Sequence, residues 1–358
     1  MATPHQVTVG SLVYTVVDDC TTTYWAIITG AVVDEILGDL YAPGISVVTG
    51  RADLPAKSTE NGLFAITGYP QQSFPHHDTM LYSVTFTISA PGFRDLKFTQ
   101  GIGIGVPFPV VITSPIPLRR LPVRVQGRVV NDLTRAPLAG VTVTTVDDPV
   151  TPPAVHAMAL RTPLYADHPS TPPVPVQLAG LTPLGTSALA EDVKAGDNIV
   201  NLANLTGLAL GSLVQLTSPG NVLVEYGVVI GLNPGAPNQA VLQSPLNRSY
   251  SKNGPVANFF SAGTTGGVAH LVKDANAGDG VLVADQLLSG TTLVVDSGPA
   301  AEYHEIGAVS DTDGYYSFDG VGSVPEIFLF AKQGALQQTA AWFIEYDQAV
   351  NIVDLRLS

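Results

Sequence analysis

Stretches rich in β-branched residues recur along the whole 358-residue chain, and they limit its fold more than any other feature. The clearest of them cover residues 24–33, 83–89, 123–130, 141–146, 213–216, 281–284 and 291–295. Gly, Pro, Asn and Asp bound these stretches, whereas apolar residues at helical spacing are nearly missing. Because β-branched side chains suit a pleated surface and the flanking residues favour turns, the sequence predicts an all-β fold.

Residues 123–130 show the alternation of a half-buried antiparallel strand most clearly. We expect Val123, Val125 and Val129 on the buried face, with Arg124, Gln126 and Arg128 on the other.

Two internal repeats divide the chain. Residues 30–35 resemble residues 127–132, at an offset of 97, and residues 59–66 resemble residues 311–318, at an offset of 252. The second copy is therefore split, and the two offsets differ by the length of the inserted block, which we place at about residues 149–306. A surface hairpin accepts such an insertion at little cost, since loop-closure entropy grows only logarithmically with length.

The repeats predict four segments. We expect a first β-sandwich at residues 1–118, a second, discontinuous one at 119–148 plus 307–358, an extended arm at 149–186 and an inserted β domain at 187–306. Nine prolines in the arm segment favour polyproline II structure. In the inserted domain, residues 191–229 are echoed by residues 273–309, which predicts two similar β units.

The motifs of the second copy are Pro-Leu-Ala-Gly-Val-Thr-Val at residues 137–143 and Ser-Asp-Thr-Asp-Gly-Tyr-Tyr-Ser-Phe at residues 310–318. They resemble the carboxypeptidase regulatory-like domain, a transthyretin-like or Ig-like β-sandwich. The resemblance extends, less closely, to residues 24–118. The inserted block is similar to small β units of phage tails and other surface structures. These resemblances imply spacers, decorations or adhesion modules, and no peptidase activity.

Two dipeptides are expected to form the hairpin turns of the two sandwiches. Asn61-Gly62 and Asp313-Gly314 provide the positive φ that a tight hairpin needs. Asp311 and Asp313 also resemble the start of a calcium loop, but the terminal Glu of such a loop is missing, so the turn is favoured.

Charge limits the partners. The formal net charge of −14 argues against nucleic acid and anionic membranes. The uncharged windows at 100–118 and 207–224 contain prolines or glycines and predict no membrane insertion. Half of the ten arginines fall in one stretch, as Arg119, Arg120, Arg124, Arg128 and Arg135. They are either a docking face for an acidic partner or a solvated strand face.

No catalytic, cofactor or metal site is expected. His76-His77-Asp78 is favoured as a solvated loop, and His304-Glu305 is isolated in the sequence. Cys20 follows two acids, which disfavour a reactive thiolate. Six aromatic residues, in principle able to stack on sugars, are more typical of a β core. They are Trp25, Tyr41, Tyr69, Tyr82, Tyr250 and Trp342.

Together these features predict a non-enzymatic structural component of a phage tail or a phage-tail-like contractile injection particle. It would act as a cap, baseplate, fibre or decoration, and would contact other structural proteins as a homo-oligomer. Residues 1–17 lack the basic start of a secretory signal, so we expect synthesis in the cytoplasm and export as part of the particle. The alternative is an adhesin that binds a carbohydrate or another surface.

Overall fold

The computed structural model is almost entirely β, with 53% strand and 2% helix, which confirms the predicted fold class. It describes residues 5–9, 12–16, 25–38, 42–148, 150, 155–218, 224–235, 237–253, 256–295, 298 and 301–358. Contacts divide the chain into two units, residues 1–119 and 120–358. No helix among the described residues is long and apolar enough to cross a membrane.

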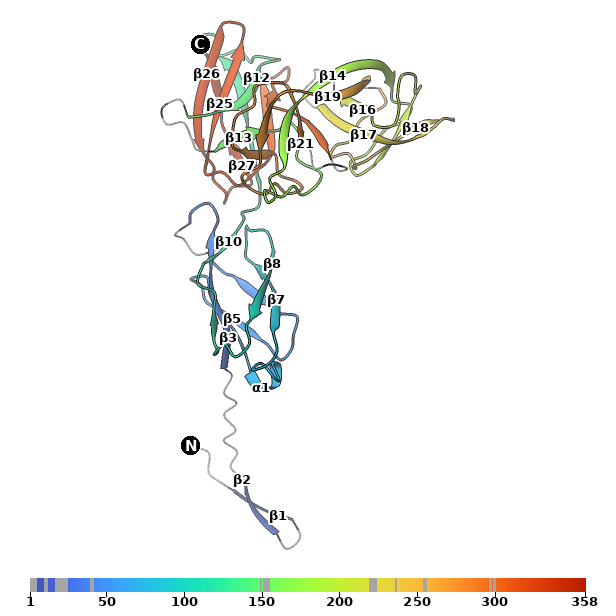
Figure 1. Cartoon of the computed structure of the whole chain (residues 1–358). Coiled ribbons are helices and arrows are strands. Elements are labelled where there is room, and N and C mark those ends of the chain that lie inside the picture. Colours follow the sequence, from blue (N-terminus) through green and yellow to red (C-terminus); the bar gives the residue numbers. More distant parts are fainter. Residues whose placement is uncertain are drawn as a thin grey trace. The chain divides into compact units, whose positions relative to one another are not determined.

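The first unit contains a two-stranded hairpin and a β-sandwich (Figure 1). The hairpin is β1 (His5–Val9) and β2 (Leu12–Val16). One sheet of the sandwich has the order β10-β3-β6-β5, with β9 also paired to β3, and the other has the order β4-β7-β8. Their bounds are β3 (Trp25–Asp34), β4 (Ser46–Val48), β5 (Ala56–Ser58), β6 (Leu63–Gly68), β7 (Tyr82–Ser89), β8 (Leu96–Ile102), β9 (Val110–Val111) and β10 (Ile116–Leu118). The short helix α1 (Pro70–Ser73) joins β6 to β7.

The second sandwich is built from two separated parts of the chain. One sheet has the order β24-β11-β27, with β28 also paired to β11, and the other has the order β23-β12-β25-β26. Their bounds are β11 (Val123–Asn131), β12 (Thr142–Val146), β23 (Ala308–Val309), β24 (Tyr315–Val321), β25 (Glu326–Gln333), β26 (Leu336–Phe343), β27 (Val350–Ile352) and β28 (Leu355–Leu357). Val125, Val143 and Phe318 are fully buried in the core between these sheets. In β11, Val123, Val125 and Val129 are buried while Arg124 and Arg128 are exposed, which confirms the predicted face.

The two sandwiches pair their strands in the same register. Gly30 of β3 faces Phe64 of β6, and Gly127 of β11 faces Tyr316 of β24. In each sandwich the last strands then run parallel to the first, β9 and β10 along β3, and β27 and β28 along β11.

Residues 155–306 form a nested block with a large sheet of its own. The sheet has the order β15-β18-β17-β16-β19-β14-β21-β22, and β13 pairs with β20 beside it. Their bounds are β13 (His156–Ala159), β14 (Pro175–Ala188), β15 (Ile199–Leu202), β16 (Leu213–Thr217), β17 (Val224–Asn233), β18 (Asn238–Leu242), β19 (Val256–His270), β20 (Val281–Ala284), β21 (Thr292–Val295) and β22 (Glu302–Glu305).

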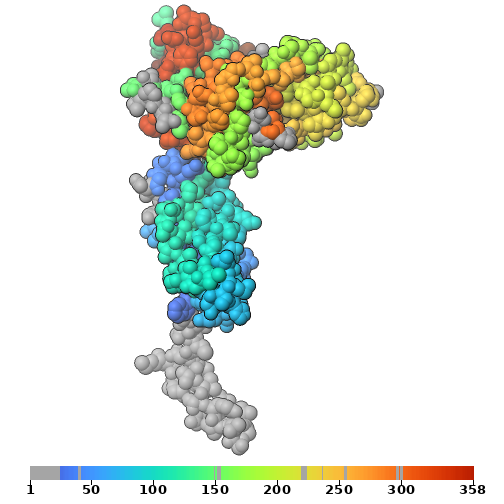
Figure 2. Space-filling model, viewed as in Figure 1, coloured from blue at the N-terminus to red at the C-terminus, as the bar shows by residue number. Residues whose placement is uncertain are grey.

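The block has two cores, joined by the long ribbon of β14 and β19. Val176 of β14 and Ala269 of β19 belong to one core, whereas Leu189, directly after β14, and Phe259 of β19 belong to the other. Ala159, Val281 and Val283 of the block are buried in the core of the second sandwich. Figure 2 shows the corresponding green-to-orange surface adjoining the red strands of that sandwich.

The expected arm at 149–186 is different in the structure. Pro149, Pro152 and Pro153 lie outside the described residues, but Met158, Leu164 and Val176 are buried in a core of the block. The two prolines of β14 stand where a strand tolerates proline: Pro175 is its first residue, and Pro183 borders a register shift of the β14–β19 pair. The described part of the segment therefore contains two paired strands, β13 and the start of β14, with the loop between them, where we expected an extended polyproline II arm.

Candidate functional site

A cluster of ionisable side chains surrounds Glu302 of β22, which is only 3% exposed. Its carboxylate accepts hydrogen bonds from the backbone N–H groups of Tyr165 (2.8 Å) and Ala166 (2.6 Å). It also accepts from Nε2 of His168 (3.2 Å) and Nε2 of His304 (2.9 Å). Four donors thus converge on one buried carboxylate.

The two imidazoles differ in their second nitrogen. Nδ1 of His304 lies 3.1 Å from the hydroxyl of Thr162, within hydrogen-bond distance, and the Tyr165 ring stacks on the imidazole. His168 donates from Nε2, but its buried Nδ1 has no hydrogen-bond partner.

The pKa of Glu302 reflects two opposing effects. Burial acts to raise it, but hydrogen bonds from His168, His304 and the Tyr165 backbone outweigh burial and lower the pKa to about 2. The carboxylate is therefore ionised over the whole physiological range.

A second buried carboxylate, Glu225 of β17, lies in the other half of the nested block. It accepts from the hydroxyls of Tyr165 (2.6 Å) and Tyr250 (2.8 Å) and from the backbone N–H of Asn247 (2.5 Å). Burial and the Glu225 charge raise the pKa of both tyrosines, which keeps them as hydrogen-bond donors.

Glu225 and Glu302 occupy equivalent positions in the two halves of the nested block. The residue before Tyr165 is Leu164, whose backbone bonds Gly278 and Asp279, and the residue before Asn247 is Leu246, whose backbone bonds Gly196 and Asp197. In both halves the next N–H and a side chain three residues later bind the glutamate: Tyr165 and His168 bind Glu302, and Asn247 and Tyr250 bind Glu225. The nested block therefore repeats one carboxylate clasp, and Tyr165 connects the two copies.

The clasps are closed to solvent. Glu225, His168 and His304 are 0% exposed. The cleft beside Tyr165, Tyr226 and Glu302 encloses about 10 Å³, no more than the space of a single water molecule. This arrangement stabilises long-range chain contacts and leaves no room for a substrate.

His304-Glu305, isolated in the sequence, is part of this region. Glu305 binds Arg161 at 2.7 Å and accepts from the hydroxyl of Tyr226 at 3.0 Å. Glu302 and His304 are two residues apart in a strand and so share one face, which was a signal for their pairing. Their other partners lie more than 130 residues away in the chain, and no local pattern identifies them.

The five arginines of the candidate docking face all have partners within the chain. Asp319 binds both Arg124 and Arg248, the latter from the nested block. The remaining contacts are Arg119 with Glu35, Arg120 over the Tyr346 ring, Arg128 with the Asp313 carbonyl and over the Tyr315 ring, and Arg135 with Asp132. These guanidinium groups serve contacts inside the chain, and their role in docking stays a prediction.

Asn61-Gly62 lies between the paired strands β5 and β6, whereas Asp313-Gly314 joins β23 and β24, which belong to the two different sheets of the second sandwich. Gly62 has φ of 75° and Gly314 has φ of 79°. The Asp311 carboxylate accepts from the backbone N–H groups of Asp313 (2.9 Å) and Tyr315 (2.8 Å). Its oxygen is thus used by the turn itself.

The remaining sequence candidates do not form a cluster. His77 Nε2 lies 2.8 Å from the Val106 carbonyl in an exposed loop. Among the described residues, no three His, Cys, Asp or Glu side chains are placed so that they could hold a metal ion. Cys20 and Tyr41 lie outside the described residues. Of the aromatics, Trp25 is 60% exposed, whereas Tyr250 is buried in the second clasp.

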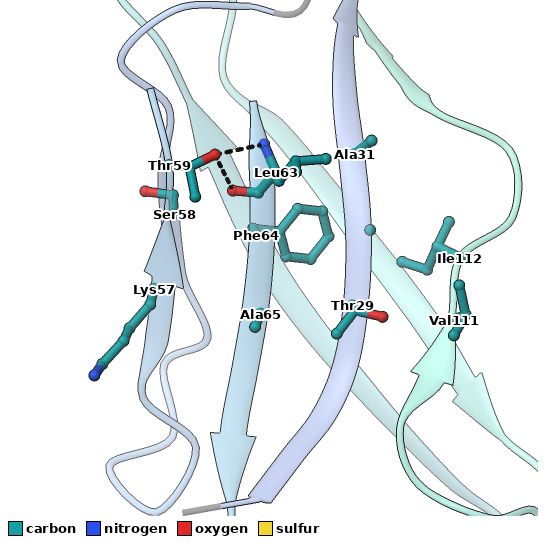
Figure 3. A pocket seen from close by; sticks show the side chains of 11 residues that line it. Thr29, Ala31, Lys57, Ser58, Thr59, Leu63, Phe64, Ala65, Val111 and Ile112 are labelled. Carbon is teal, nitrogen blue, oxygen red and sulfur yellow. Dashed lines mark hydrogen bonds between the residues drawn. The ribbon is translucent and has the colours of Figure 1, made fainter. Parts of the chain in front are cut away.

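The first sandwich has a hollow of about 500 Å³ on the β5-β6-β3 sheet (Figure 3). Small residues form its floor, and the Phe64 ring lies over Gly30, where a Cβ atom would come within 2.8 Å of that ring. Leu63 and Val111, both exposed, lie at its sides, and Lys57 is also part of its lining. The hollow is predominantly apolar.

No protein-family model matches the chain, and no curated protein matches its sequence. Among solved structures, it is similar to BcpA, the major pilin subunit of Bacillus cereus, with 10% identity, 94% of this chain and 99% of that chain covered, and a TM-score of 0.19. A streptococcal ancillary pilin has 12% identity, with 85% and 80% covered and a TM-score of 0.14. TM-scores this low carry no argument about function.

Proposed function

We propose that this chain is a non-enzymatic structural component of a phage tail or a phage-tail-like contractile injection particle. It would act through protein–protein contacts as a cap, baseplate, fibre or decoration, and reach the outside of the cell as part of the particle. The sealed pair of carboxylate clasps at Glu225 and Glu302 supports this proposal most directly. The residues best suited to chemistry bind one another and fix the nested block, as expected where rigidity matters more than access.

The modular build supports the same proposal. We infer that the two sandwiches are copies of one carboxypeptidase regulatory-like, transthyretin-like domain, because Gly30↔Phe64 and Gly127↔Tyr316 pair equivalently. Such a duplication, with a block nested in one copy, adds surface for contacts with other proteins.

Labelling of native material tests the proposal. An antibody against the chain is expected to mark a fixed position on purified tail-like particles in electron microscopy, and the chain should co-purify with the particle's other structural proteins. Recovery of the chain only outside such particles would overturn it.

An adhesin is the second candidate, favoured by the hollow around Gly30 and Phe64. Here the hollow would receive part of a surface glycan or another surface molecule. Binding of the full chain to a glycan array, lost on changing Ala65 in the hollow to Trp, would favour the adhesin. A particle-bound chain without glycan binding would favour the first candidate.

A further inference from the structure

Strand β26 is the outermost strand of the β23-β12-β25-β26 sheet (Figure 1). Its eight residues, Leu-Gln-Gln-Thr-Ala-Ala-Trp-Phe, include no charged residue and no proline. The register with β25 contains no bulge over its whole length. Edge strands are usually protected by charge, proline, a bulge or shortness, and β26 has none of these.

The direction of its backbone groups follows from the hairpin. Gln333 pairs with Leu336 around a two-residue turn in which Gly334 has φ of 61°. Since the pair that closes such a turn is hydrogen-bonded, residues 337, 339, 341 and 343 direct their N–H and C=O groups away from β25. The N–H of Gln337 indeed donates to the Ser358 carbonyl, at 3.3 Å, and not to β25.

Among the described residues, no backbone group bonds the outward N–H and C=O groups of Thr339, Ala341 and Phe343. Within the described residues, β26 pairs only with β25. The side chains of the same three residues are exposed, and Phe343 is 72% exposed. By contrast, Gln338, Ala340 and Trp342 are half-buried on the inner face.

The distribution of charge indicates which strand can pair with the free edge of β26. The chain carries a net charge of −14, so two copies repel each other over most of their surfaces. The β26 edge is uncharged, whereas the edge strands β8 and β24 carry Lys97 and Asp319. The edge strands β4 and β15 are uncharged too but have only three and four residues, so among the described edges β26 offers a second copy the longest pairing without like charges.

We propose that two copies of this chain associate through antiparallel pairing of their β26 strands, with Ala341 on the two-fold axis. Ala341 would then face Ala341 of the partner subunit, and Thr339 would face Phe343 of the partner subunit. Each opposed pair exchanges both N–H···O bonds, which satisfies all three outward residues. The small Ala341 side chain lets the strands meet, and Phe343 covers the partner's Thr339. The two sheets become one continuous sheet.

Sedimentation velocity and amide hydrogen exchange of the full chain test this interface. We expect a monomer–dimer equilibrium, with amides of Thr339, Ala341 and Phe343 protected only at concentrations where the dimer forms. The amides of Gln338, Ala340 and Trp342 should be protected at every concentration. A chain that stays monomeric at about 100 µM, roughly the upper range for specific weak association, would overturn the proposal.

Substitutions at the axis locate the contact. Ala341→Lys places like charges opposite each other and should weaken association by about tenfold or more. Ala341→Pro removes the outward N–H without touching the β25 pairing, and should act similarly. Val48→Lys, the matching change on the exposed edge strand β4 of the first unit, should leave association unchanged. A dimer that tolerates both Ala341 variants, or that Val48→Lys weakens equally, rejects the β26 contact.

Circular dichroism and melting temperature check that these variants fold. If either variant fails to fold, the exchange pattern of the unaltered chain still decides. The inference rests on the homo-oligomer expected in the proposed function, but its experiments are separate from the particle labelling. A monomeric chain would remove the β26 contact while leaving antibody-labelled particles unaffected.

Discussion

Tyr165 and Glu225, 60 residues apart in the chain, are joined by a 2.6 Å hydrogen bond from the phenol to the carboxylate. The backbone N–H of the same tyrosine donates to Glu302 at 2.8 Å. One residue thus binds a buried carboxylate in each half of the nested block. The two halves are therefore expected to unfold together.

Removing the Tyr165 hydroxyl should weaken the connection between the two halves of the nested block. Tyr165→Phe leaves the buried Glu225 with one donor fewer, and should lower the free energy of unfolding by about 1–3 kcal/mol. Urea unfolding followed by tyrosine fluorescence measures the loss. Tyr315→Phe, on a half-exposed ring, is the control and should be nearly neutral. Equal effects of the two changes would contradict the role given to Tyr165.

Acid should weaken the clasp around Glu302. Its folded-state pKa of about 2 lies below the ordinary value of 4.5, so its contribution is complete above pH 4.5 and is lost as the pH falls toward 2. The contribution at stake is about 3 kcal/mol. The stability difference between the unaltered chain and Glu302→Gln should therefore shrink across this window in melting experiments. The exposed Glu60→Gln serves as control, and parallel curves for Glu302→Gln would refute the assignment.

A methyl group at Gly127 should disrupt the second sandwich. A Cβ atom there would lie 1.8 Å from the Val353 carbonyl oxygen, so the backbone of the parallel strands must move. We expect Gly127→Ala to destabilise by about 3 kcal/mol, the upper end for overpacking. Gly101→Ala in β8, with no atom within 4 Å of the added Cβ, should change stability by less than about 0.5 kcal/mol. Thermal unfolding of both variants checks the contrast.

Asp319 should help hold the nested block on the sandwich. Its carboxylate binds Arg248 of the block and Arg124 of β11, and Arg248 is largely shielded from solvent. Asp319→Asn should cost about 1 kcal/mol in urea unfolding, with a smaller loss at high salt. Asp132→Asn removes only the exposed pair with Arg135 and should have almost no effect. A salt-independent loss at Asp319 would argue against an ionic contact.

Local patterns predicted the fold class and the buried face of β11, because alternation along a strand is a property of adjacent residues. The carboxylate clasps were missed for the opposite reason. Glu302 meets Tyr165 and His168 across more than 130 residues, and single carboxylates or imidazoles have no periodicity. The proline content of residues 149–186 favoured an extended arm because composition reflects local backbone preferences and contains no information on tertiary contacts. In the structure, Val176 of that segment is buried between β19 and β21.

The sequence by itself determined that the chain is built of strands, since side-chain shape and alternation act over a few residues. It also contained the two repeat offsets that separate the parts of the second copy. Only the tertiary structure decided that the nested block shares the core of the second sandwich and closes around two buried carboxylates. Burial and hydrogen bonding between distant residues depend on which surfaces meet, and this is settled when the whole chain packs.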